Sequence, residues 1–63
     1  MTFYVTFGQK SPFKGGWVEV EAEDMKHAKE KAEYAMGEEW AKIYYYHNFH
    51  PSYYPDGKIG QTI

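Results

Sequence analysis

Apolar and polar positions alternate in two short segments near the start of the chain, residues 2–7 and residues 17–22. A period of two in β-branched and aromatic residues predicts strands. The positions expected to face inward are Phe3, Val5, Phe7, Val18, Val20 and Ala22. The loop between the segments contains Pro12 and the pair Gly15-Gly16, which favour turns. The two strands are therefore expected to form a hairpin with a long loop.

The apolar period changes to that of a helix after residue 24. Asp24 is a suitable N-cap, and Gly37 is placed as a C-cap after a helix that ends near Met36. One apolar stripe comprises Met25, Ala28, Ala32 and Ala35 or Met36. Because this stripe is mostly alanine, we expect the helix to lie close against a sheet whose aromatic side chains supply the bulk.

A third strand is predicted over Trp40–Tyr46, with Ala41, Ile43 and Tyr45 toward the core. A right-handed crossover through the helix would place this strand parallel to the second, with the first strand between them. Residues 47–57 are expected to form a long loop, and Lys58–Ile63 a short edge strand hairpinned to the third. The fold class is thus α+β, a single domain over residues 1–63 in which one helix packs on a three- to four-stranded mixed or antiparallel sheet (ββαββ).

Aromatic residues are concentrated in one stretch of the chain. Of the thirteen Trp, Tyr and Phe residues, seven lie between Trp40 and Tyr54. A core of this size needs few large side chains, so the surplus favours a recognition surface, to which tyrosine brings rigid contact area and a polar tip. Alternation assigns Trp40, Lys42, Tyr44 and Tyr46 to the outer face, which continues into the loop.

Charge and composition narrow the function classes. The chain has seven lysines, no arginine, nine acidic residues and a net charge of −2, a balance that counts against nucleic-acid binding. It has no cysteine, which removes disulfides and thiolate chemistry. No apolar stretch has the length of a membrane span, and the N-terminus lacks the features of a signal peptide. The expected compartment is the cytoplasm.

Candidate catalytic chemistry is weak. His47 and His50, with Asp56 as a third ligand, form a poor zinc motif, because structural zinc sites usually have four ligands and often use cysteine. His27 and the pair Glu38-Glu39 lack the spacing of an acid/base site. We therefore expect no metal, no cofactor and no enzymatic activity.

Two binding hypotheses remain. The first is protein binding, because interface cores and hot spots favour Tyr and Trp; self-association into a homodimer would use the same side chains. The alternative is a small module for single-stranded nucleic acid or nucleotides, in which bases would stack on aromatic rings and lysines would contact phosphates. The residues of this alternative are Trp17, Trp40, Tyr44, Tyr46, Tyr53 and Tyr54, with Lys10, Lys14, Lys42 and Lys58.

The chain as a whole resembles a group of small, mostly uncharacterised proteins of phages and prophages. The resemblance is carried by Phe3-Tyr4-Val5-Thr6-Phe7-Gly8-Gln9, Gly16-Trp17-Val18-Glu19-Val20-Glu21-Ala22, Gly37-x-x-Trp40-Ala41-x-Ile43-Tyr44 and Ser52-Tyr53-Tyr54-Pro55-Asp56-Gly57-x-Ile59. No catalytic or ligand motif comes with it.

This resemblance implies an accessory protein that acts in the cytoplasm of an infected bacterium. Proteins of this kind often bind and inhibit a host protein, including CRISPR–Cas effectors and other nucleic-acid-processing defence complexes. The residues expected to contact the partner are Trp17, Tyr44, Tyr46, His47, Phe49, His50, Tyr53 and Tyr54, with Glu19 and Glu21 as acidic contacts.

Overall fold

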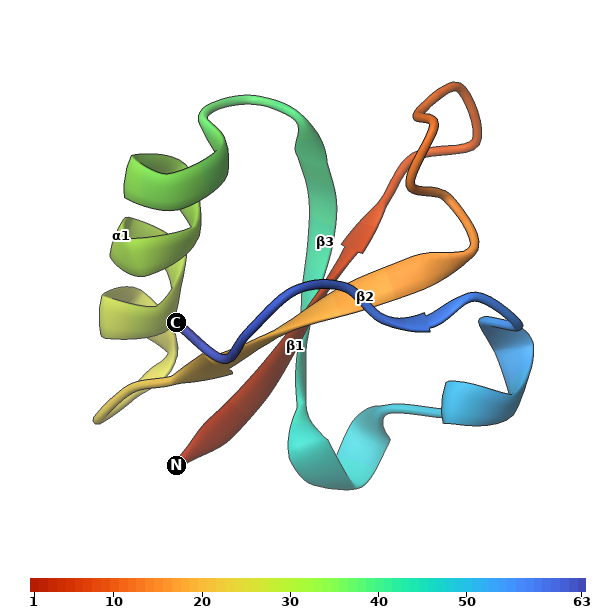
Figure 1. Cartoon of the computed structure of the whole chain (residues 1–63). Coiled ribbons are helices and arrows are strands. Elements are labelled where there is room, and N and C mark those ends of the chain that lie inside the picture. Colours follow the sequence, from red (N-terminus) through yellow and green to blue (C-terminus); the bar gives the residue numbers. More distant parts are fainter.

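One helix lies on one side of a four-stranded mixed sheet, and two short 3-10 turns lie on the other side (Figure 1). The computed structural model covers residues 1–63. Its elements are β1 (Thr2–Phe7), β2 (Gly16–Glu21), α1 (Met25–Met36), β3 (Trp40–Tyr45), η1 (Tyr46–Asn48), η2 (Pro51–Tyr53) and β4 (Gly57–Lys58). This confirms the predicted α+β class and the order ββαββ.

β1 occupies the centre of the sheet, whose strand order is β3-β1-β2-β4. It pairs antiparallel with both neighbours, so that Phe3 lies opposite Val20 of β2 and opposite Tyr45 of β3. The predicted placement of the first strand between the second and third is confirmed. Because β1 has a strand on each side, its backbone polar groups are paired in both directions.

The prediction for the final strand, Lys58–Ile63 paired with the third strand, was wrong in both its extent and its partner. β4 contains only Gly57 and Lys58, and it pairs parallel with β2 at the edge opposite β3. The following tail continues along β2: Ile59 N donates to Trp17 O (2.7 Å) and Glu21 N donates to Ile63 O (2.9 Å). A hairpin with β3 does not form because residues 46–56 cross to the far edge of the sheet. Gly60, with φ of 63°, interrupts the regular strand.

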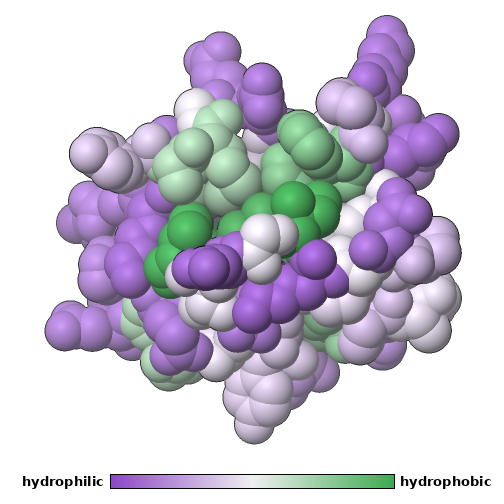
Figure 2. Space-filling view, viewed as in Figure 1, coloured by the Kyte–Doolittle hydropathy of each residue, from purple (hydrophilic) through white to green (hydrophobic).

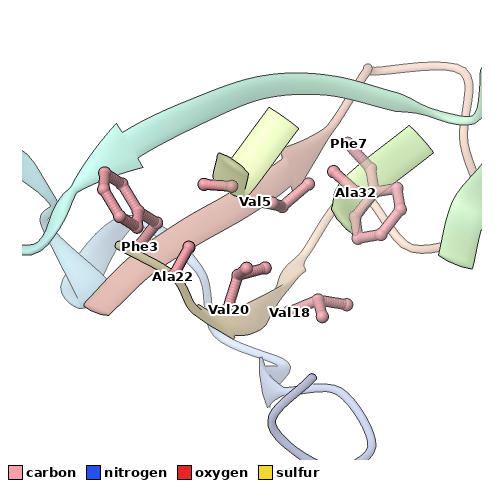
Figure 3. Packing of buried hydrophobic residues seen from close by; sticks show 8 residues of the cluster. Phe3, Val5, Phe7, Val18, Val20, Ala22 and Ala32 are labelled. Atoms are coloured by element: carbon pink, nitrogen blue, oxygen red, sulfur yellow. The ribbon is translucent and has the colours of Figure 1, made fainter. Parts of the chain in front are cut away.

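The main core lies between α1 and the sheet (Figure 3). Phe3, Val5 and Val20 are fully buried, as are Ala28 and Ala32 of the helix. The alanines let the helix approach closely while the strands supply the volume, as the sequence predicted. At the end of the helical stripe Met36 packs against this core, whereas Ala35 is exposed.

The two faces of β3 differ from the predicted alternation. Ala41, expected in the core, is exposed, and Trp40, expected outside, packs against the core together with Ile43 and Tyr45. The cause is a register shift in the β1–β3 pairing between Thr6 and Phe7. A bulge of this kind adds one residue to a strand and reverses the facing of the side chains beyond it.

The helix termini agree with the sequence. The side chain of Asp24 accepts a hydrogen bond from His27 N (2.8 Å), and Gly37, with φ of 62°, donates its N–H to Glu33 O. A left-handed conformation after the last turn is favourable for glycine. No helix in this fold has the length and apolar character to cross a membrane.

The helix cap gives a direct stability prediction. Asp24→Ala removes the acceptor for the first-turn N–H and should lower the free energy of unfolding by about 1 kcal/mol. Asp24→Asn keeps an acceptor oxygen and should retain most of the stability. Urea denaturation followed by circular dichroism measures both; equal losses would show that side-chain capping is not what stabilises this end.

Candidate functional site

The face of the sheet opposite the helix carries a second packed group of aromatic rings. Tyr4 of β1, Trp17 of β2 and Tyr44 of β3 are half-buried there, because each lies at an outward position of its strand. Phe49, in the segment between η1 and η2, stacks on Tyr4 with ring centroids 4.5 Å apart and an interplanar angle of 18°. Only 9% of Phe49 is exposed.

We call this group the aromatic cap; it comprises Tyr4, Trp17, Tyr44, Phe49 and Tyr54. Phe49 is at its centre, 5.2 Å from Trp17, 5.2 Å from Tyr54 and 6.0 Å from Tyr44 between ring centroids. Such distances and angles are those of favourable stacked and edge-to-face pairs. The indole Nε1 of Trp17 is buried without a hydrogen-bond partner, so this side chain is held by ring packing.

The prediction that the aromatic residues of the loop after β3 are exposed was therefore only partly correct. Phe49 is buried and Tyr54 is half-buried, whereas Tyr46 and Tyr53 are 64% and 74% exposed. The physical reason is that one helix covers only one face of the sheet. The segment after β3 has to cover the aromatic residues on the other face, and it does so with its own rings.

Four exposed ring side chains lie on the two turns that flank Phe49, and we call them the tyrosine rim: Tyr46, His47, His50 and Tyr53. Two backbone hydrogen bonds close the second turn, η2: Tyr53 N donates to His50 O (3.1 Å) and Tyr54 N donates to Pro51 O (3.0 Å). Neighbouring rings also contact each other: His47 lies 5.7 Å from Tyr46, and His50 lies 5.4 Å from Tyr53. All four side chains are exposed.

The two acidic residues predicted as partner contacts are engaged within the chain. Glu19 accepts a hydrogen bond from Thr62 Oγ1 (2.7 Å) and lies 3.7 Å from Lys58 Nζ. Glu21 accepts from Thr2 Oγ1 and lies 3.8 Å from the N-terminal amine. Their side chains thus join β2 to the tail and to the start of β1.

The residues considered for metal binding and acid/base chemistry do not converge. Asp56 is attached to the loop before β2, where its N–H donates to Gly15 O (2.8 Å). No group of three or more His, Cys, Asp or Glu side chains has the geometry to hold a metal ion. His27 Nδ1 accepts from Glu23 N (3.3 Å), next to the helix cap.

The helix side of the molecule offers a second surface that the sequence did not single out. An open groove of about 580 Å³ is lined by His27, Glu30, Lys31, Tyr34, Ala35 and Ile63. Apolar side chains gather in the middle of the face shown in Figure 2, with hydrophilic side chains around them. Tyr34 is 95% exposed. An aromatic residue on the polar side of the helical pattern was the sequence signal that could have indicated this surface.

Burial in the cap changes the acidity of two tyrosines. Desolvation raises the pKa of Tyr4 above its ordinary value of 10.0, and the negative charges of Glu19 and Glu21 raise it further. Desolvation also raises the pKa of Tyr54, with a contribution from Tyr44 in the same direction. The folded cap therefore favours the neutral phenols.

Comparison of the chain with protein families, with characterised proteins and with solved structures finds no match. The aromatic cap and the tyrosine rim are therefore the features from which a function can be inferred.

The cap predicts different mutational effects for neighbouring aromatic residues. Phe49→Ala should lower the free energy of unfolding by about 3 kcal/mol, because it removes the buried ring at the centre of the cap. Tyr54→Ala should also destabilise the fold. Tyr53→Ala, at an exposed position, should change stability by less than about 0.5 kcal/mol. Equal effects of Phe49→Ala and Tyr53→Ala in urea denaturation would contradict this assignment.

The raised tyrosine pKa values predict a stability loss in alkali. As pH rises above about 10, the unfolded state loses its phenolic protons before the folded state does, so the free energy of unfolding should fall. Tyr4→Phe should make this fall shallower, because one of the two groups no longer titrates. Denaturation curves from neutral pH to about pH 11 test both statements; a stability that stays constant or rises would contradict them.

Proposed function

We propose that this chain is a non-enzymatic protein-binding module whose contact surface is the tyrosine rim. The observation that carries the proposal is the support beneath Tyr46 and Tyr53. Both rings are mostly exposed, yet both lie on turns anchored by the buried Phe49. Rings held in this way lose little conformational entropy on binding, which is a property of effective contact residues.

The arrangement of the rings favours protein over single-stranded nucleic acid as the partner. Trp17, Tyr44 and Tyr54 pack against Phe49, so their faces are engaged within the cap. Lys58 lies beside Glu19, and the rim itself contains no lysine. Stacking of successive bases requires free ring faces along a positively charged groove.

The resemblance to phage accessory proteins also suggests what kind of partner this chain binds. On that basis the partner is a host protein, such as a CRISPR–Cas or other defence effector, and binding inhibits or modulates it. Blocking by shape fits the low net charge of −2 better than mimicry of nucleic-acid charge, and Glu19 and Glu21 are engaged within the chain.

Affinity capture from bacterial lysate, with and without nuclease, tests the proposal. The chain should recover a protein from the lysate, and the recovery of that protein should persist after nuclease treatment. The double variant Tyr46→Ala/Tyr53→Ala should weaken its binding by roughly thirtyfold or more, because each ring is expected to be a binding hot spot. Circular dichroism should show an unchanged fold.

Tyr34→Ala is the matched control, because it removes an even more exposed tyrosine from the helix side of the sheet. It should leave binding unchanged. Loss of binding in Tyr34→Ala, with retention in the rim variant, would move the contact surface to the groove beside α1. Recovery of nucleic acid alone would reject the protein-binding proposal in favour of the nucleic-acid alternative.

A further inference from the structure

One segment, residues 46–56, crosses the cap side of the sheet from β3 to β4 (Figure 1); we call it the strap. It leaves the sheet at one edge and returns at the other, because the strand order is β3-β1-β2-β4. Both ends are fixed, since Tyr45 pairs with β1 and Gly57 pairs with β2. Next to the second end, Asp56 N donates to Gly15 O (2.8 Å). The strap is thus a span with two anchored ends.

Between these ends the strap is held to the sheet mainly by ring packing. Phe49 makes no backbone hydrogen bond. The backbone bonds of η2 are local turn bonds, from Tyr53 N to His50 O and from Tyr54 N to Pro51 O. No side chain of the strap takes part in an ion pair. A segment with few backbone bonds to its surroundings and little buried apolar surface opens more readily than a core strand.

The packing under the strap is separate from the main core. The apolar cluster between α1 and the sheet contains no residue of the strap. Of the buried hydrophobic residues, Phe49 is the one that lies outside this cluster. The sheet itself stands between the two groups, so lifting the strap would uncover Tyr4, Trp17 and Tyr44 and would leave the helix-side packing in place.

The strap is also longer than the distance between its ends. Neighbouring strands lie about 4.8 Å apart, so the step from β3 to β4 is about 14 Å. Tyr45 is aligned through Phe3 with Val20 of β2. Gly57 is aligned with Gly16, about 13 Å away along the same strand. The ends are therefore roughly 20 Å apart, whereas the strap can extend to roughly 36 Å, which lets it lift without unpairing either end.

We propose that the strap opens and closes over the aromatic cap as one unit while the sheet and α1 stay folded. In the closed form Phe49 and Tyr54 pack against Trp17, and Phe49 stacks on Tyr4. In the open form the rings of Tyr4 and Trp17 meet solvent. The closed form dominates because opening exposes these rings together with the buried side chain of Phe49.

Opening of the strap regulates the tyrosine rim, because Tyr46 and Tyr53 lie on its two turns. A partner that contacts both rings binds the closed form and shifts the population toward it. The apparent affinity then depends on the fraction of chains that are closed. This consequence rests on the proposed function, whereas the opening itself does not.

Hydrogen exchange of the Trp17 indole, measured by NMR on the chain alone, is the first test. The Nε1–H is buried without a hydrogen bond, so burial alone protects it, and Phe49 and Tyr54 of the strap are among the rings around it. Its protection factor should be at least tenfold lower than that of the slowest amides of β1 and β2, and less sensitive to urea. Equal protection and equal urea dependence would overturn the proposal, because the strap would then open only with global unfolding. An indole that exchanges at the unprotected rate would overturn the closed form.

Two variants test what holds the strap closed. In Phe49→Ala the Trp17 indole should exchange within about tenfold of the unprotected rate, while the slowest β1 amides remain protected. Tyr53→Ala, at an exposed position of the same strap, should change the protection of the indole by less than about twofold. Loss of amide protection together with indole protection in Phe49→Ala would show that strap and core are one cooperative unit. Because no partner is present, failure here leaves the rim proposal standing, and a rim without a partner leaves the opening of the strap standing.

Discussion

The stacking of Phe49 on Tyr4 is the contact on which the second half of this structure depends. A single helix covers one face of the sheet, and the other face presents rings at the outward positions of three strands. Without a cover those rings would meet water on a chain already small for an independent core. Phe49 closes that face. In doing so it fixes the path of the chain from β3 across the sheet to the far edge, where β4 and the tail join β2.

The same contact separates aromatic residues that stabilise the fold from those available for binding. Trp17, Tyr44 and Tyr54 pack around Phe49, whereas Tyr46 and Tyr53 remain exposed on the turns at either side. The buried ring of Phe49 holds the turns η1 and η2 in position, and these turns in turn position the exposed rings of Tyr46 and Tyr53. The exposed aromatic surface proposed for recognition is thus a consequence of how a chain with one helix covers two faces of a sheet.

Local patterns predicted β1, β2 and α1, because alternation, the Asp24 cap and Gly37 act within a few residues of sequence. The crossover through the helix predicted that the second and third strands are parallel, which left a place for the first strand between them. The tail could not be placed in this way: its pairing with β2 depends on long-range hydrogen bonds, and β4 is too short to leave a periodic signal. No local sequence pattern indicates the bulge that turns Trp40 inward either. Most cap residues were identified, but Phe49 was assigned to the surface; the outward aromatic Tyr4 on the central strand was the signal that such a ring needed a cover.

The most direct measurement is a nuclear Overhauser spectrum of the folded chain in solution. Strong cross-peaks are expected between the ring protons of Phe49 and those of Tyr4 and Trp17, with upfield-shifted resonances for the stacked rings. No comparable contacts are expected from Tyr53 to the strands. Random-coil shifts for residues 46–56, with no cross-peak between Phe49 and Tyr4, would contradict the stacking of Phe49 on the sheet, because the segment would then not cover it and the rim would have no fixed geometry.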